Sequence, residues 1–220
     1  MKKSACIIPI KTYSSRLSQK NFRLLGGKSL YKYLIESIVK ANCFDRIYLD
    51  SDSEIIKDYA NDCGLGFIQR KPEFAKGSAG GNDLIEYYRE IIPEYDYYFQ
   101  AHVTSPFLKP ESIRICHDIL TGINEYNSVL TVMDVKKFLW HQFKPVNYDP
   151  KILPRTQELE PVHEETSGLY GITAKEFDRN RCRIGSKPYF YIVDEKEAVD
   201  IDTIEDFKYA EYLLHRDIKI

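Results

Sequence analysis

Short apolar runs alternate with amphipathic segments along most of this chain, and that alternation most constrains its fold. The run ACIIPI at residues 5–10 is apolar throughout, as in a strand that is buried on both faces. From Ser29, apolar residues such as Leu30, Leu34 and Ile38 recur at the spacing of a helix with one buried face. The later strand-like runs, RIYLD, GFIQR, YDYYFQAHVT and NSVLTVMDV, each follow another helical segment.

Strands that alternate with single helices require crossover connections, which produce a mostly parallel sheet with helices on both faces. The sequence therefore predicts an α/β, Rossmann-like fold, and its 220 residues suit a single domain over 1–220. We expect SGLYGI and YFYIVDEKEAVDID to be further strands and TIEDFKYAEYLLHR to be a closing helix. The pattern breaks into prolines, aromatics and charges at 135–161, which we interpret as a dimerisation or lid extension.

Charge and composition exclude several classes of protein. Thirty-one Lys and Arg against 33 Asp and Glu give a net charge of −2, which argues against nucleic acid or an anionic membrane as a partner. No run approaches the roughly 18 apolar residues of a membrane span, so we expect a cytoplasmic protein. The five cysteines are widely spaced and form no CxxC pair, so neither a disulfide framework nor a structural zinc site is expected.

The loop after the first strand, KTYSSRLSQKN, is the first candidate binding site, because ligands of parallel sheets gather at the carboxyl ends of strands. It concentrates cations and hydroxyls that suit the oxygens of a triphosphate: Lys11, Thr12, Ser14, Ser15, Arg16 and Lys20. A solvated basic loop is the alternative. Two other phosphate motifs fail: GGKS lacks the P-loop glycine where Phe22 stands, and GxGxxG is absent from the first turn.

The segment VDIDTIEDF is the second candidate. On an extended chain Asp200 and Asp202 would point to one side, where hard carboxylate oxygens could hold Mg²⁺. Thr203 and Asp206 approximate a capping box that begins the last helix. The alternative is that Asp202 is merely a turn or capping residue, since a bare DxD often occurs by chance.

A rival DxD stands at Asp50 and Asp52, after the second expected strand. We favour a capping role here, because Asp52 or Ser53 precedes a helix expected from Glu54. The pair nevertheless sustains a competing hypothesis, a glycosyltransferase that uses nucleotide sugars. His102, beside Thr104 in FQAHVTSPF, is a candidate ligand contact, whereas no motif suggests covalent hydrolysis.

Six segments, in order, resemble the acylneuraminate cytidylyltransferases, the CMP-sugar synthetases: IIPIKTYSSRLSQKN, GKSLYKYLI, CFDRIYLDSD, VTSPFLKPESI, ETSGLYGI and DIDTIEDFKYAE. The resemblance spans nearly the whole chain. It implies a Rossmann-like nucleotidyltransferase fold, a homodimer, and a Mg²⁺-dependent reaction of CTP with an acidic sugar that gives a CMP-sugar and pyrophosphate.

The resemblance also implies roles for particular residues. Lys20 and Asn21 match the KN pair that engages the nucleotide, and Arg16 lies in the basic loop. Asp200 and Asp202 match the DxD that binds the metal. Gly168, in SGLY, matches a turn near the nucleotide and sugar sites, and Asp52 sits in the motif usually written STD.

Three departures from the family pattern concern the acceptor more than the nucleotide. Lys11 replaces the arginine that usually opens the first loop, which keeps the charge but loses a bidentate fork. His102 stands where the family often has glutamine near the sugar. Sialic acid enzymes can carry an arginine before the SGLY-like turn, where this chain has Glu164 and Glu165.

The resulting hypothesis is a cytidylyltransferase that activates a nonulosonic or related sugar acid for surface glycan synthesis. Lys11, Arg16 and Lys20 would hold the triphosphate, with Arg16, Lys20 and Asp202 acting in catalysis, while Asp200 and Asp202 hold Mg²⁺. His102, Thr104 and Gly168 would contact the substrate. The alternatives are a sugar 1-phosphate nucleotidyltransferase, the DxD glycosyltransferase, and an inactive nucleotide-binding subunit.

Overall fold

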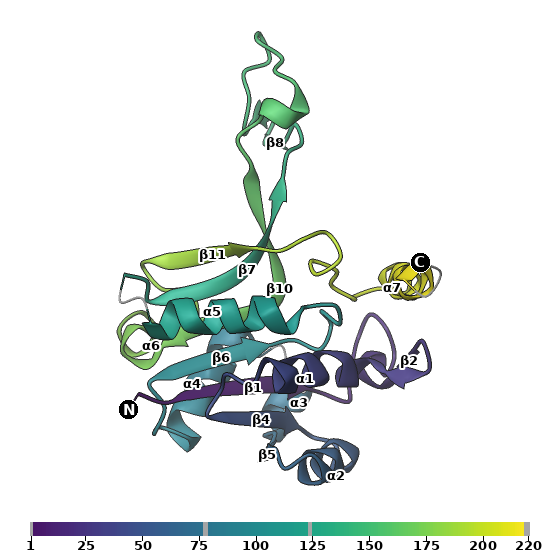
Figure 1. Ribbon diagram of the computed structural model, residues 1–220, viewed down its shortest axis with the longest axis vertical. Helices are drawn as coiled ribbons and strands as arrows, with labels where there is room; N and C mark the ends of the chain where they lie inside the picture. The colour runs from purple at the N-terminus through teal and green to yellow at the C-terminus, as the bar shows by residue number, and fades with distance from the viewer. Residues whose placement is uncertain (1, 77–78, 123–124, 218–220) are drawn as a thin grey trace.

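The computed structural model describes residues 2–76, 79–122 and 125–217 of the protein (Figure 1). Seven strands of this part of the chain form one sheet in the order β11-β7-β10-β6-β1-β4-β5. Their bounds are β1 (Ser4–Ile10), β4 (Arg46–Ser51), β5 (Gly66–Gln69), β6 (Tyr97–Ala101), β7 (Ser128–Val135), β10 (Val162–Thr173) and β11 (Pro188–Ile192). All neighbouring pairs are parallel except those of β10, which runs antiparallel to β6 and β7. The expected α/β fold with a mostly parallel sheet is confirmed.

Helices cover both faces of the sheet because side chains of a strand alternate between faces. In β1, Cys6, Ile8 and Ile10 pack into one core, whereas Ala5 and Ile7 pack into another. The first core is closed by α1 (Leu30–Ala41), α2 (Glu54–Asp62) and α5 (Pro110–Gly122). The second is closed by α3 (Pro72–Lys76), α4 (Gly81–Ile91) and α6 (Ala174–Asn180).

The last helix, α7 (Ile204–Asp217), packs away from the sheet against the segment that follows β1. Its partner there is a small hairpin of β2 (Leu24–Leu25) and β3 (Lys28–Ser29). The hairpin turns at Gly26 and Gly27, whose φ angles of 55° and 84° are readily adopted by glycine. This packing brings the end of the described chain beside the first loop.

Two expectations for the second half of the sheet need correction. The strand expected at SGLYGI is far longer, begins at Val162, and carries a bulge between Glu165 and Tyr170, where Ser167 has a φ of 60°. The strand expected over 189–202 ends at Ile192. Beyond it, the Asp194 carboxylate accepts hydrogen bonds from the backbone N–H groups of Lys196 and Glu197, which turns the chain instead of extending it.

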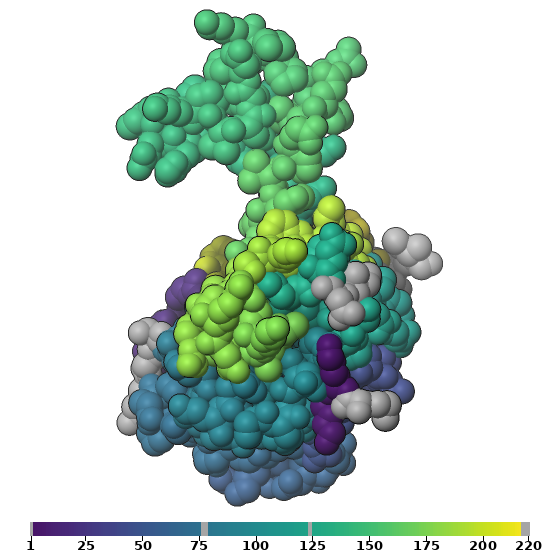
Figure 2. Space-filling model, turned by 90° about the vertical axis from the view of Figure 1, so that its left-hand side faces the viewer, coloured from purple at the N-terminus to yellow at the C-terminus, as the bar shows by residue number. Residues whose placement is uncertain are grey.

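An arm, residues 136–161, projects from the body between β7 and β10 (Figures 1 and 2). It contains a short hairpin of β8 (Trp140–His141) and β9 (Lys144–Pro145) and one turn of 3₁₀ helix, η2 (Thr156–Glu158). Large apolar side chains stand exposed on it: Trp140 at 58%, Phe143 at 99%, Ile152 at 74% and Leu153 at 67%. Within the described ranges, no helix has the length and apolar character that crossing a bilayer requires.

Candidate functional site

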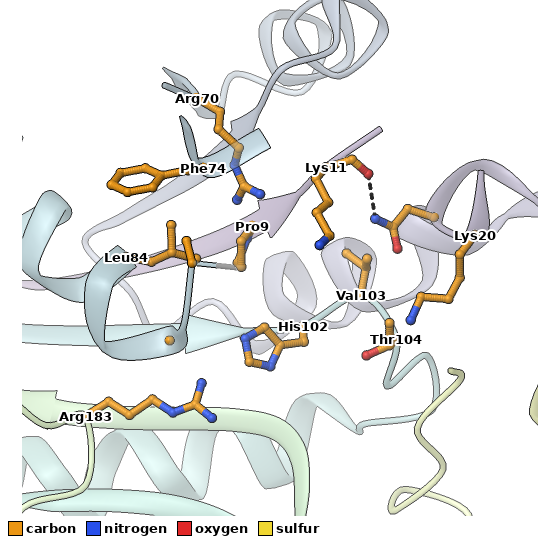
Figure 3. Close-up of a pocket in the computed structure, with 13 residues that line it drawn as sticks. Pro9, Lys11, Lys20, Arg70, Phe74, Leu84, His102, Val103, Thr104 and Arg183 are labelled. Carbon is orange, nitrogen blue, oxygen red and sulfur yellow. Dashed lines mark hydrogen bonds between the residues drawn. The ribbon is translucent and has the colours of Figure 1, made fainter. Parts of the chain in front are cut away.

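A pocket of about 330 Å³ opens where β1, β5 and β6 end. These parallel strands have their carboxyl ends at one edge of the sheet, where ligands of such sheets bind. Pro9 and Lys11 come from the end of β1, Arg70 directly follows β5, and His102 and Thr104 follow β6. Figure 3 shows the cationic ends of Lys11, Lys20 and Arg183 directed from different sides toward the space beside His102.

The two sequence candidates meet at this pocket. Lys20 lines it, and its Nζ donates to Asp202 Oδ1 at 2.8 Å across a separation of 182 residues. Arg16 NH1 lies 2.8 Å from the other oxygen, Asp202 Oδ2. The Lys20 side chain is only 11% exposed, whereas that of Arg16 is 64% exposed. A buried lysine and a solvent-facing arginine thus share one carboxylate.

Local structure explains how these groups are held. Lys20 begins a 3₁₀ turn, η1 (Lys20–Phe22), and the Asn21 side-chain amide donates to the Lys11 carbonyl at 2.9 Å. Asn21 Oδ1 is buried without a hydrogen-bond partner in the described chain, which leaves an acceptor at the pocket wall. On the acidic side, the Ile201 backbone N–H donates to the Thr104 carbonyl at 2.8 Å, which ties the segment of Asp200 and Asp202 to the end of β6.

The expected capping box at the start of α7 is present. Thr203 N–H and Asp202 N–H donate to Asp206 Oδ2 at 2.8 and 3.0 Å, and the Asp206 N–H donates to Thr203 Oγ1. Asp206, not Asp202, therefore supplies the capping carboxylate. The Asp202 side chain does not cap the helix, and it pairs instead with Lys20 and Arg16.

Asp200 is the second acid of this segment. Burial raises its pKa; a hydrogen bond from Thr104 opposes this shift, and the charge of Asp202 adds to it. Its Oδ1 is buried without a partner in the described residues. No third His, Cys, Asp or Glu of the described chain joins the pair as a metal ligand. Two carboxylates with one orphaned oxygen fit Mg²⁺, which takes the rest of its ligands from water and substrate phosphates.

His102 lies in the pocket wall and is held by the bulge of β10. Its Nδ1 lies 2.7 Å from the Ser167 carbonyl, and because a carbonyl only accepts, Nδ1 carries the proton and Nε2 remains an acceptor. Burial and the nearby charge of Arg183 lower the pKa of His102 to about 4, so the ring is neutral at physiological pH. The His102 backbone N–H donates to the Gly168 carbonyl at 3.2 Å.

The structure does not bring every candidate to the pocket wall. Gly168 lies behind His102, where an added Cβ would stand 3.3 Å from Thr131 Oγ1. Ser14 and Ser15 lie in the first loop outside the set of described residues that line the pocket. Asp200 and Asp202 also lie outside that set: Asp202 meets the pocket through Lys20, and Arg16 reaches it only through Asp202. Lys11, Lys20, Asn21, His102 and Thr104 do line it.

The rival pair, Asp50 and Asp52, is divided between two unrelated contacts. Asp50 is 1% exposed and forms a bidentate ion pair with Arg70 at 2.6 and 3.1 Å, with a third hydrogen bond from Tyr88. Asp52 accepts hydrogen bonds from the backbone and hydroxyl of Thr12. Ser53 is the N-cap residue of α2 but makes no side-chain capping bond, so the favoured capping by either side chain was wrong.

The residues that line the pocket but were not identified from the sequence include Arg70, Gly81 and Arg183. Arg70 immediately follows a strand, so the strand-end rule would have found it. Gly81 begins α4, and an added Cβ there would lie 2.2 Å from Arg183 NH1. Arg183 stands in an irregular loop between α6 and β11, where no sequence pattern marks it.

Comparisons with known proteins agree with this architecture. A family model described as Cytidylyltransferase matches residues 5–214. The chain is 27% identical over 215 residues to the N-acylneuraminate cytidylyltransferase of Oncorhynchus mykiss, covering 94% of this chain and 49% of that protein. It is 27% identical over 225 residues to the CMP-N,N'-diacetyllegionaminic acid synthase of Legionella pneumophila, covering 94% of each. The chain thus spans about half the length of the N-acylneuraminate cytidylyltransferases that it matches.

The fold is also found among solved structures. That of CMP:2-keto-3-deoxy-manno-octonic acid synthetase complexed with CTP superposes with a TM-score of 0.71, covering 98% of this chain and 100% of that one. At 14% identity this likeness concerns the fold alone. The family match over nearly the whole length, together with the ordered sequence segments, confirms the resemblance. The chain belongs to the cytidylyltransferase family.

Proposed function

We propose that this protein transfers CMP from CTP to an acidic sugar, of the nonulosonic or acylneuraminate-like class, and releases pyrophosphate for surface glycan synthesis. One observation supports this most: the 2.8 Å contact of Lys20 and Asp202 joins the cationic loop after β1 to the acidic segment before α7 at one pocket. Binding of a triphosphate requires cationic side chains, and transfer of its nucleotidyl group requires carboxylates that hold a divalent metal ion. This edge of the sheet holds both.

The proposed reaction is a displacement at the α-phosphorus of CTP. A sugar hydroxyl oxygen forms a bond to this phosphorus, the bond to the bridging oxygen breaks, and pyrophosphate leaves with the electron pair while the hydroxyl proton passes to solvent. Lys11 and Lys20 line the pocket and would neutralise the growing charge on the phosphates, with Arg16 at its edge. Asn21 Oδ1 and the neutral His102 offer acceptors for substrate hydroxyl or amino groups.

Asp200 and Asp202 would hold Mg²⁺ in this site. When bound, the ion would polarise the phosphoryl oxygens and ease deprotonation of the acceptor hydroxyl. Lys20 and Arg16 pair with Asp202 in the structure, so this carboxylate also fixes the two cations at the pocket edge. The hydrogen bond from the Ile201 N–H to the Thr104 carbonyl holds the segment that carries both acids beside the end of β6.

We further propose a single catalytic domain that acts as a cytoplasmic homodimer. The exposed apolar side chains of the arm support the dimer, because a second copy would remove Trp140 and Phe143 from water. We propose the cytoplasm as the compartment because it supplies nucleoside triphosphates.

Pyrophosphate release tests the proposal. Purified protein with Mg²⁺ would be given each nucleoside triphosphate in turn with four acids: N-acetylneuraminic, pseudaminic, N,N'-diacetyllegionaminic and 2-keto-3-deoxy-manno-octonic acid. We expect release with CTP and one or more acids, and a CMP-sugar by mass spectrometry. Turnover only with a sugar 1-phosphate would favour the alternative transferase. CTP binding without turnover of any acceptor would indicate an inactive subunit.

A further inference from the structure

The loop of residues 181–187 places one guanidinium in the pocket wall that the cytidylyltransferase hypothesis does not use. Arg183 NH1 donates to Gln100 Oε1 at 2.8 Å, and its guanidinium carbon lies 3.5 Å from the centre of the Tyr170 ring. Gln100 belongs to β6 and Tyr170 to β10, so two central strands hold this side chain. In Figure 3 it lies below His102, across the pocket from Lys11.

The charge of Arg183 is not neutralised by an ion pair within the described residues, so it is available to a ligand. Of the four cationic side chains among the described residues that line the pocket, Lys20 is paired with Asp202 and Arg70 with Asp50. The contacts of Arg183 are a neutral amide and a neutral aromatic ring, and no carboxylate within the described ranges forms an ion pair with it. The Gln100 amide binds one guanidinium nitrogen, and the Tyr170 ring covers one face of the guanidinium. The remaining N–H donors of this planar group are therefore available to an anion.

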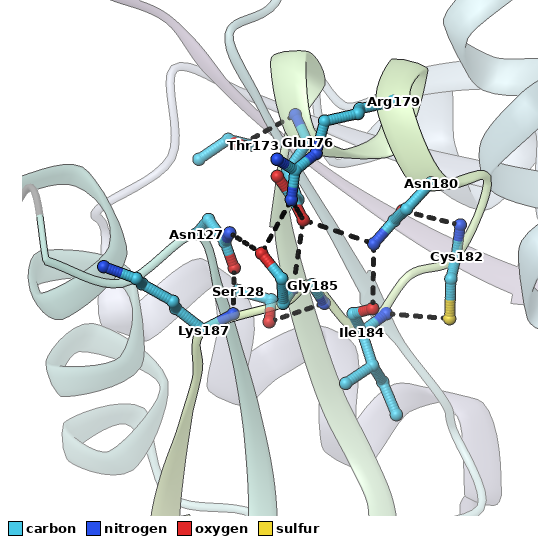
Figure 4. Close-up of polar contacts among 11 residues, drawn as sticks. Asn127, Ser128, Thr173, Glu176, Arg179, Asn180, Cys182, Ile184, Gly185 and Lys187 are labelled. Carbon is cyan, nitrogen blue, oxygen red and sulfur yellow. Dashed lines mark hydrogen bonds and ion pairs between the residues drawn. The ribbon is translucent and has the colours of Figure 1, made fainter.

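The loop that carries Arg183 is fixed by hydrogen bonds along its backbone (Figure 4). Cys182 N–H donates to Asn180 Oδ1, Gly185 N–H to Ser128 Oγ, and Ser186 N–H to Glu176 Oε1, at 2.8 to 3.0 Å. The Arg183 N–H itself donates to Asn82 Oδ1 at 2.9 Å. Backbone groups bound in this way leave little freedom, so the guanidinium is preorganised before any ligand arrives.

The surrounding residues leave room for the guanidinium and hold the ring on which it stacks. Gly81 lets the guanidinium approach the start of α4, since a Cβ there would lie 2.2 Å from NH1. Glu165 accepts a hydrogen bond from the Tyr170 hydroxyl at 2.7 Å. It therefore secures the ring on which Arg183 stacks.

We propose that Arg183 binds the carboxylate of the acceptor sugar and is the residue that selects acidic over neutral sugars. This inference rests on the proposed cytidylyltransferase function. Its physical basis is the bidentate geometry of guanidinium and carboxylate, which gives orientation as well as affinity. The acceptor would then lie between Arg183 and the phosphates held at Lys11 and Lys20, with His102 beside it.

The test is a comparison of Arg183→Gln and Arg183→Lys with the wild type, using the best acceptor among the four acids named above. Loss of a charged hydrogen-bonded contact should raise the KM for the acid by about 10- to 100-fold, with the KM for CTP unchanged. Lysine keeps the charge without the fork, so Arg183→Lys should recover part of the loss. Arg181→Gln is the matched control, because Arg181 lies two residues away and pairs with Glu86 on the surface.

The carboxamide of the same sugar separates carboxylate binding from a general effect on the pocket. The wild type should use the acid far better than the amide, whereas Arg183→Gln should use the two about equally. Unchanged preference for the acid in Arg183→Gln, or a rise in the KM for CTP in place of that for the acid, would overturn the inference. Circular dichroism and thermal melting would establish that the variants are folded.

Calorimetry distinguishes failure of this inference from failure of the proposed function. If the wild type binds an acid but releases no pyrophosphate, the function is wrong, and Arg183→Gln should still weaken acid binding about 10- to 100-fold. If the wild type binds none of the four acids, with or without CTP, both fail. If it turns over an acid that Arg183→Gln binds equally well, only the role of Arg183 is wrong.

Discussion

Lys20 Nζ and Asp202 Oδ1 lie 2.8 Å apart although 182 residues separate them in the chain. The lysine side chain is 11% exposed and the aspartate 31%, so the contact is partly shielded from solvent. Arg16 approaches the same carboxylate from the solvent side. This arrangement concentrates two positive charges and one negative charge around Lys20, which lines the pocket, and the charge of Asp200 acts on the same lysine. The following predictions depend on these contacts and on those that surround them.

Asp202→Asn should lower the rate of pyrophosphate release about 10²- to 10³-fold, because it removes the charge shared by Lys20 and Arg16. Its effect on the melting temperature should be smaller than that of Asp50→Asn, since Asp202 is 31% exposed, the charge of Asp200 still acts on Lys20, and Asp206 caps α7. Asp206→Ala is the informative contrast and should cost about 1 kcal/mol of unfolding free energy. Equal destabilisation by both variants would contradict this division of roles.

Asp50→Asn should lower the free energy of unfolding by about 3–5 kcal/mol, because it leaves the Arg70 charge buried without its partner. Urea denaturation would measure the loss. Asp52→Asn should cost much less, since its bonds to Thr12 are exposed. A folded Asp50→Asn protein of wild-type stability that has lost glycosyl transfer would support the glycosyltransferase hypothesis instead.

The stability of the protein should fall as the pH decreases from 6.5 to 4, in part through His102. Burial and Arg183 lower the pKa of this side chain from 6.5 to about 4. Between these values the unfolded chain binds a proton at this histidine and the folded chain does not, so acidification favours unfolding. In His102→Gln the free energy of unfolding, measured by denaturation at several pH values, should fall less steeply across this window. An identical pH dependence in both proteins would show that the ring titrates normally.

Trp140→Ser combined with Phe143→Ser should convert the proposed dimer to a monomer without lowering the melting temperature. Both side chains are exposed on the arm, so their replacement removes no core contact. Sedimentation velocity would measure the change. Ile55→Ser, at a 62% exposed position on α2, is the control and should leave sedimentation unchanged. A wild-type protein that sediments as a monomer at all concentrations would contradict the proposed dimer.

The parallel half of the sheet could be predicted from the sequence because its strands are short apolar runs bounded by clear helices. β1, β4 and β5 lie where those runs predicted them, and Gly64 ends α2 with a φ of 69°. β10 could not be predicted in the same way. Its first half, from Val162, is polar and belongs to the base of the arm, so only tertiary pairing with β7 makes it a strand.

Sequence reasoning found the charged residues of the candidate site that lie close after an expected strand. It did not find the residue whose position depends on contacts with other elements. Lys20 lines the pocket as expected, and Asp202 contacts it, but the extended strand expected to carry Asp200 and Asp202 was wrong, since β11 ends at Ile192. Asp50 could be taken for part of a functional DxD pair because its ion-pair partner, Arg70, lies 20 residues later in the chain. Arg183 depends on stacking and on a glycine in another element, neither of which leaves a local signal.

The placement of α7 beside the first loop has a consequence for synthesis. The ribosome delivers all seven described strands of the main sheet by Ile192, before it delivers Asp200 and Asp202. A nascent chain can therefore complete its sheet while Lys20 still lacks its counter-ion. Chain elongation would thus delay the onset of the proposed activity, because the last acids to emerge from the exit tunnel complete the proposed site, whose first cations were made about 180 residues earlier.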